Sequence, residues 1–225
     1  MARLLLTAFR PFDGRDENAS WLALQSLTRD LSGFASAGEL GVTTRLYPVD
    51  YDELKPRLSS DLADGYDVVL HVGQAAGAAA IRLEQFALNA RRDRGDRSDA
   101  ARPLEPDGPA AYRSGLPLGD WTRRLRDAGA PAELSLHAGD YLCNAAMYWS
   151  HHLTATSGQR PLIGFVHLPL DVSQAAAEAR ETPSLPTEIS ALALRLLVAW
   201  SAEACAAACR VAEGAAAPHS SEATA

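Results

Sequence analysis

The chain has 225 residues, of which 47% are hydrophobic and 22% charged, and its formal net charge is -7. A chain of this length and composition can bury a full core and falls at the upper end of single-domain size. The negative charge argues against a nucleic-acid partner, which needs clustered Lys and Arg. The one local basic cluster, residues 91–97, has aspartates between its arginines, so we expect it to be a solvated loop.

The cysteine count and the apolar runs bear on the compartment of the protein. Three cysteines are an odd number for a domain of this size and predict no disulfide framework. The apolar run at residues 4–7 is too short for a signal peptide, and no uninterrupted apolar run approaches the roughly 20 residues that span a bilayer. We therefore expect a cytoplasmic protein with no membrane partner.

Strand-like and helix-like segments alternate along the chain. Short apolar or alternating runs predict strands at residues 4–7, 42–49, 67–72, 81–90 and 162–166. Helical periodicity predicts helices at residues 20–27, capped by Ser20, and at 51–62, 121–128, 144–149 and 185–209. The Pro- and Gly-rich residues 100–119 are predicted to be a loop.

This alternation predicts an α/β fold, a three-layer α/β/α sandwich around a mostly parallel, mixed sheet. We see no internal repeat and no internal boundary, so we expect a single domain of residues 1–212. The Ala-, Ser- and Thr-rich residues 213–225 cannot bury enough surface to stay ordered, and a disordered tail is expected there.

Cys143 and His167 are the candidates for nucleophile and base. Cys143 lies where a turn at residues 138–140 gives way to a helical run. The positive end of the helix dipole favours a thiolate there, and the thiolate is the nucleophilic form. His167 closes an apolar strand-like run, where side chains reach the cleft beyond the strand ends. The pattern alone also fits a cysteine that is buried only for packing.

Five blocks of sequence strengthen this hypothesis, because they occur together and in a characteristic order. They are TAFRPFDG at residues 7–14, VGQAAG at 72–77, LEQFALN at 83–89, GDYLCN at 139–144 with Tyr148, and FVHLP at 165–169. Together they resemble the pyroglutamyl peptidase I family, the pyrrolidone-carboxylate peptidases, over roughly residues 4–200. The resemblance implies a catalytic triad of Cys143, His167 and Glu84. In it, Cys143 attacks the acyl carbonyl, His167 moves the proton and Glu84 orients the imidazole.

The same resemblance implies a cysteine exopeptidase that removes pyroglutamate from peptide N-termini, without a metal or an organic cofactor. Phe9 and Phe12 match the aromatic residues that flank the lactam ring, and backbone groups near Gln74 match the lactam-binding turn. Arg94 aligns with an arginine near the active site, and with backbone N–H groups around Cys143 it would hold the oxyanion. Such a pocket would reject proline, because its polar groups would be left unpaired.

Three departures from the family pattern affect the pocket rather than the triad. Ala8 and Arg10 stand where the family usually has Gly and Glu. Ala76 replaces a glycine, which matters if that position needs a positive φ. Residues 95–99 replace the family's segment I-P-D-N-x-G, which makes the placement of Arg94 uncertain.

Other functions remain open from the sequence. One is a hydrolase on the same fold that acts on a different small amide or ester, and another is a catalytically silent lactam- or peptide-binding protein. The Cys205/Cys209 pair and His151-His152 have suggestive spacing, but no further His or acidic residue completes a metal-ligand set. A homo-oligomer, either a dimer or a tetramer, is also open, because members of the family that the chain resembles often form one.

Overall fold

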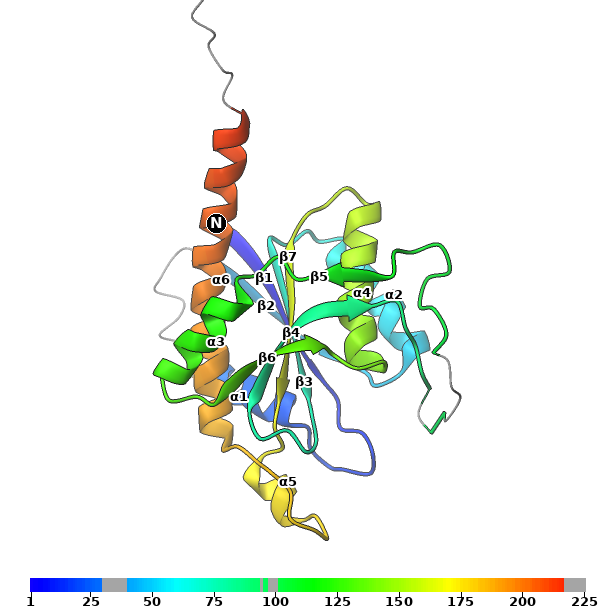
Figure 1. Ribbon diagram of the computed structural model, residues 1–225, viewed down its shortest axis with the longest axis vertical. Coiled ribbons are helices and arrows are strands. Elements are labelled where there is room, and N and C mark those ends of the chain that lie inside the picture. The colour runs from blue at the N-terminus through cyan, green and yellow to red at the C-terminus, as the bar shows by residue number, and fades with distance from the viewer. Residues whose placement is uncertain (30–39, 94, 97–100, 217–225) are drawn as a thin grey trace, which may run out of the picture.

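The computed structural model describes residues 1–29, 40–93, 95–96 and 101–216, in which one seven-stranded sheet lies between two layers of helices (Figure 1). The strands are β1 (Ala2–Phe9), β2 (Leu40–Tyr47), β3 (Val68–Gln74), β4 (Ile81–Leu88), β5 (Ala111–Arg113), β6 (Ala132–His137) and β7 (Leu162–Leu168). The helices are α1 (Ala19–Arg29), α2 (Tyr51–Leu62), α3 (Leu118–Asp127), α4 (Leu142–Thr156), α5 (Val172–Ala176) and α6 (Thr187–Ala216).

The sheet is mixed and mostly parallel. Strands β2, β1, β3 and β7 are parallel neighbours in that order. Strand β4 is antiparallel to β7 and β5 and parallel to β6. The carboxyl ends of β1, β3 and β7 therefore meet at one edge of the sheet, which is where sites gather in sheets of this kind.

Each face of the sheet carries its own hydrophobic core. Helices α1, α3 and α6 cover one face, and α2 and α4 cover the other (Figure 1). Alternate residues of β1 enter opposite cores, since Leu4 and Leu6 belong to the first and Leu5 and Phe9 to the second. These layers confirm the predicted three-layer sandwich.

Several local predictions differ from the structure. The segment predicted to be a loop, residues 100–119, contains β5 and the beginning of α3, while β6 and α5 were not predicted at all. β6 escapes the sequence pattern because it borders the described sheet, where it pairs with β4, and leaves Leu134 and Leu136 exposed. The predicted cap of α1 is also wrong. Asn18 is the capping residue, since Ser20 N donates to Asn18 Oδ1 at 3.0 Å, whereas Ser20 Oγ accepts from Phe9 N.

Helix α6 is longer than predicted. It ends at Ala216 and so includes the first four residues of the expected tail, 213–216, while residues 217–225 lie outside the described part of the chain. By length and composition, Thr187–Val211 is the one described helical stretch that could cross a membrane. Leu194 and Leu197 in it are fully buried in the core, as in a core helix, so this is weak evidence for a span.

Candidate active site

The structure brings His167 and Glu84 into direct contact. His167 Nδ1 lies 2.8 Å from Glu84 Oε1, and the two residues are 7% and 1% exposed. Glu84 on β4 is paired with Phe165 on β7, which makes His167 its diagonal neighbour on the same face of the antiparallel pair. The register of two strands therefore aligns the carboxylate with the imidazole.

Cys143 reaches the same place from α4. It is the second residue of that helix and is partly exposed. On β3, Gly73 is the register partner of His167. A Cβ atom added to Gly73 would lie 3.0 Å from Cys143 Sγ and 2.7 Å from Phe165 Cζ, so only glycine leaves room for both side chains. The thiol thus lies directly over the end of β3, beside the strand that carries His167.

The electrostatics of the site favour a protonated imidazole. Burial alone lowers the pKa of His167, but the negative charge and hydrogen bond of Cys143, followed by those of Glu84, outweigh it and raise the pKa to about 9. An imidazolium held between a thiol and a carboxylate is the arrangement that stabilises a thiolate–imidazolium pair.

Asn144 fixes the beginning of α4 to the end of β4. Its Oδ1 accepts from Leu88 N at 2.8 Å, and its Nδ2 donates to Leu88 O and Ala90 O, both at 2.9 Å. The side chain is fully buried and anchors Cys143 relative to the strand that carries Glu84. No role was predicted for Asn144, although a polar residue at the start of an otherwise apolar helical run was the signal.

The turn before Cys143 is held by the basic segment that the sequence predicted to be a solvated loop. Arg92 N donates to Asp140 O at 2.8 Å, and Arg92 Nε pairs with Asp140 Oδ2 at 2.8 Å. Tyr51 Oη in turn donates to Arg92 O, and the guanidinium of Arg91 stacks on the Tyr51 ring at 3.9 Å. The described part of this segment is therefore tied to the nucleophile turn.

The two predicted substrate-binding aromatic residues lie in different surroundings. Phe9 is buried in the core, with its ring centroid 6.2 Å from that of Phe165, which is itself 4.7 Å from the His167 ring. Phe12 is only partly buried on the loop that follows β1. Phe12 is thus the more accessible of the two, while Phe9 packs near Phe165 in the core.

The side chain and the backbone of Gln74 face different partners. Its Oε1 accepts from Ala19 N and Gln174 Nε2, both at 2.8 Å. Ala75 N bonds to Leu168 O of β7, so by strand alternation the N–H and C=O of Gln74 face the β1 side. The described β1–β3 ladder ends at the pair Thr7–His71. The Gln74 peptide groups therefore point into the gap where the two strands separate.

Ala76, Arg94 and the candidate metal ligands differ in what the structure shows of them. Among the described residues other than glycine, only Asp13 has a positive φ, so Ala76 carries no such strain and Gly77, with φ of 85°, makes the turn. Arg94 lies outside the described residues. Within the described ranges no three His, Cys, Asp or Glu residues gather as a metal site, and the His151 ring stacks on Tyr112 instead.

Comparisons with known proteins all point to one family. The family model for pyroglutamyl peptidase matches residues 2–204. The pyrrolidone-carboxylate peptidase of Pyrococcus furiosus is 36% identical over 172 residues, which cover 74% of this chain and 80% of that protein. The one of Streptomyces coelicolor is 35% identical over 90% of this chain and 93% of its own length.

A solved structure shares the fold as well. The pyrrolidone carboxyl peptidase from Fervidobacterium islandicum superimposes with a TM-score of 0.80 at 29% identity, covering 88% of this chain and 97% of its own. The chain therefore belongs to the pyroglutamyl peptidase family and is a peptidase.

Proposed function

We propose that this peptidase hydrolyses the amide bond after an N-terminal pyroglutamyl residue, with Cys143 as the nucleophile. The observation that carries the proposal is the buried His167, bonded to Glu84 through Nδ1 and in contact with Cys143. Because Nδ1 is taken by the carboxylate, Nε2 is the nitrogen that serves the thiol. These are the positions of nucleophile, base and orienting acid in a cysteine hydrolase.

The reaction follows from these groups in two steps. The Cys143 thiolate attacks the pyroglutamyl carbonyl carbon, and the His167 imidazolium gives its proton to the leaving amine as the C–N bond breaks. The neutral imidazole then takes a proton from water, whose oxygen attacks the thioester, and the C–S bond breaks to release pyroglutamic acid and restore the Cys143 thiolate beside the His167 imidazolium. Glu84 keeps the imidazole oriented and stabilises its charged form in both steps.

The oxyanion has a ready site at the start of α4. The first N–H groups of a helix have no partner within the helix. The N-cap residue Tyr141 makes no side-chain capping bond to them. The N–H of Cys143 is among these groups, so an oxyanion formed by attack of its own Sγ would be stabilised there.

The pocket chemistry suits a small uncharged lactam. The N–H and C=O of Gln74, directed into the gap between β1 and β3, match the lactam's C=O and N–H in pairs. Phe12, the more accessible of the two aromatic residues, would cover the flat face of the ring. Proline offers the pocket no ring carbonyl, so the Gln74 N–H would lose its partner and the discrimination should be large.

Hydrolysis of pyroglutamyl-aminomethylcoumarin beside the prolyl and alanyl compounds, by wild type and Cys143→Ser, tests the proposal. We expect turnover of the pyroglutamyl compound alone, abolished in the variant. Turnover of another amide would support the divergent hydrolase. Binding of pyroglutamate without any turnover by the folded wild type would support the silent binding protein. Peptides with N-terminal pyroglutamate are the proposed substrates, and a cytoplasmic location and a homo-oligomer stay predictions.

A further inference from the structure

The loop between β1 and α1 carries Phe12 but is poorly supported by apolar packing. A cavity of about 670 Å³ separates residues 13–17 of this loop from α5 and the residues after it. The loop also turns sharply, with φ of 62° at Asp13 and 71° at Gly14, and Arg15 N closes the turn on Phe12 O at 3.2 Å. Polar contacts across the cavity therefore help to set the position of residues 13–17.

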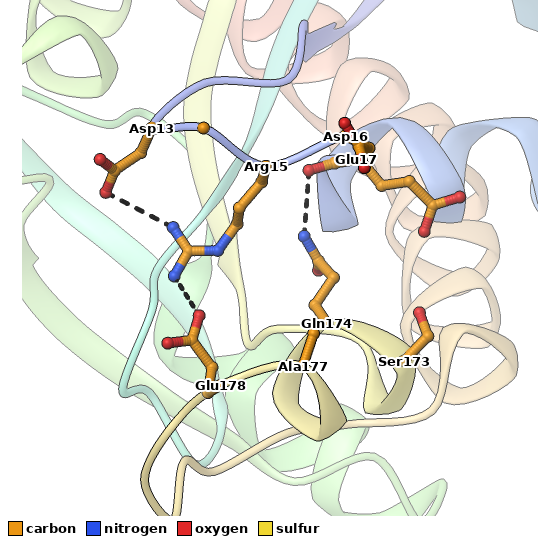
Figure 2. A pocket seen from close by; sticks show the side chains of 9 residues that line it. Asp13, Arg15, Asp16, Glu17, Ser173, Gln174, Ala177 and Glu178 are labelled. Atoms are coloured by element: carbon orange, nitrogen blue, oxygen red, sulfur yellow. Dashed lines mark hydrogen bonds and ion pairs between the residues drawn. The ribbon is translucent and has the colours of Figure 1, made fainter.

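Gln174 on α5 makes the most buried of these contacts. Figure 2 shows its hydrogen bond to the backbone of Glu17. Its Nε2 donates to Glu17 O at 3.0 Å and to Gln74 Oε1 at 2.8 Å. Its Oε1 accepts from Asp171 N at 2.9 Å and completes the capping box of α5. Both hydrogens of the amide and its oxygen are thus used, and only one orientation of the amide satisfies all three partners.

A second contact crosses the same cavity. The Arg15 guanidinium pairs with Glu178 beyond α5 and with Asp13 Oδ2 at 3.5 Å (Figure 2). The Arg15 and Glu178 side chains are 22% and 27% exposed. This ion pair anchors the Phe12 turn directly, while Gln174 anchors the carboxyl end of the loop.

Gln174 joins two parts of the proposed pocket, the loop of Phe12 through Glu17 and the end of β3 through Gln74. It lies on α5, which follows the strand of His167. We propose that Gln174 is a positioning residue that sets the width of the lactam slot, acting through Glu17 and Gln74, with Arg15–Glu178 as the second anchor. This inference rests on the proposed function, because it assigns the slot between Phe12 and Gln74 to the substrate.

The isosteric variant Gln174→Glu tests the inference. The carboxylate keeps an acceptor for Asp171 N but presents oxygens to two other acceptors, Glu17 O and Gln74 Oε1. For pyroglutamyl-aminomethylcoumarin we expect KM to rise about tenfold or more, the scale of a lost buried hydrogen bond, with kcat little changed. The inhibition constant of free pyroglutamate should rise by the same factor.

A readout at the nucleophile separates positioning of the slot from general damage. The rate at which iodoacetamide alkylates Cys143 should be the same in Gln174→Glu and wild type. Arg15→Gln should raise KM in the same direction, whereas the matched control Arg180→Gln, an exposed arginine of the next segment, should not. If Gln174→Glu folds poorly, Gln174→Met removes the same donors without adding charge.

The outcomes distinguish this inference from the function on which it rests. An unchanged KM and inhibition constant in folded Gln174 variants of an active enzyme would overturn the inference alone. So would a loss confined to kcat and the alkylation rate, because Gln174 would then act on the nucleophile. A wild type that neither cleaves the pyroglutamyl compound nor binds pyroglutamate would overturn the proposed function, and the inference with it.

Discussion

Glu84 accepts a 2.8 Å hydrogen bond from His167 Nδ1 across two antiparallel strands, and both side chains are buried. A buried carboxylate is costly unless it is paired, so this bond serves both residues. The imidazole gains a fixed orientation with Nε2 toward Cys143, and the carboxylate gains a cationic partner. The pair is thus one unit, and a change in either member should affect the other.

Replacing Glu84 by Gln should reduce kcat by roughly 10²- to 10⁴-fold, since the amide neither stabilises the imidazolium nor enforces the correct tautomer. KM for the pyroglutamyl substrate should change little, because Glu84 faces the histidine rather than the pocket. Steady-state kinetics of purified variants provide the measurement. Glu133→Gln is the matched control, since Glu133 lies on the adjoining strand and pairs with Arg82 at a half-exposed site. Equal effects of the two substitutions would contradict the orienting role.

The pKa of His167, raised to about 9, should depend on Cys143. After burial, which lowers this pKa, the thiol is the largest influence and raises it. Cys143→Ala should therefore lower the pKa of His167, which an NMR titration of the imidazole can follow. Activity of the wild type should fall above about pH 9, where the imidazolium that protonates the leaving amine is lost. A titration midpoint that is the same in both proteins would refute the thiolate–imidazolium pair.

The raised pKa of His167 also makes the free energy of unfolding depend on pH. A histidine whose pKa is raised on folding contributes stability that is full below its unfolded pKa, about 6.5, and is lost as the pH rises toward about 9. Urea unfolding of the wild type between pH 6 and pH 10 should show this loss. It should be smaller in Cys143→Ala, because that variant holds the proton less tightly.

The sequence predicted the triad because each member lies within a short, ordered block. It could not predict the residues that hold these blocks together. Asn144 bonds to Leu88, 56 residues away, and Gln174 bonds to Gln74, 100 residues away. No local periodicity records such partners, since they depend on which strands become neighbours in the sheet.

The short elements β5 and α5 were missed for a related reason. β5 has three residues and α5 has five, so neither is long enough to show a period of its own. α5 is stabilised by Asp171, whose side chain accepts from Ser173 and also from Thr187 at the start of α6. That capping role is visible only when both helices are placed.

Two histidines outside the site, the fully buried His71 and the partly buried His151, should make the protein sensitive to acid. Burial lowers the pKa of His71 to about 3 and that of His151 to about 4. A histidine buried in its neutral form contributes stability above its unfolded pKa, about 6.5, and this is lost as the pH falls toward the folded value. We expect a loss of stability between pH 6.5 and 4, to which His151 contributes up to about 3 kcal/mol.

His151→Phe tests this directly. The phenyl ring can keep the stack on Tyr112, whose ring centroid lies 5.2 Å from that of His151, and it removes Nε2, which has no partner among the described residues. The free energy of unfolding of this variant should fall less steeply from pH 6.5 to pH 4 than that of the wild type. Parallel curves would mean that His151 takes up no proton on unfolding.

Gly73→Ala should damage the active site without unfolding the protein. The new Cβ would lie 2.7 Å from Phe165 Cζ and 3.0 Å from Cys143 Sγ, and Phe165 is fully buried and has no free space to move. The thiol must then shift, and a displacement near 1 Å at the reacting atom can cost about 10²-fold in rate. Overpacking should also cost about 1–3 kcal/mol of stability.

Gly119→Ala is the control for Gly73→Ala, because a Cβ there meets nothing within 4 Å and lies in the first turn of α3. It should keep full activity and gain a few tenths of a kcal/mol from helix propensity. Should Gly73→Ala match Gly119→Ala in kcat/KM, Cys143 would not lie over the end of β3, and the nucleophile would have to be placed elsewhere.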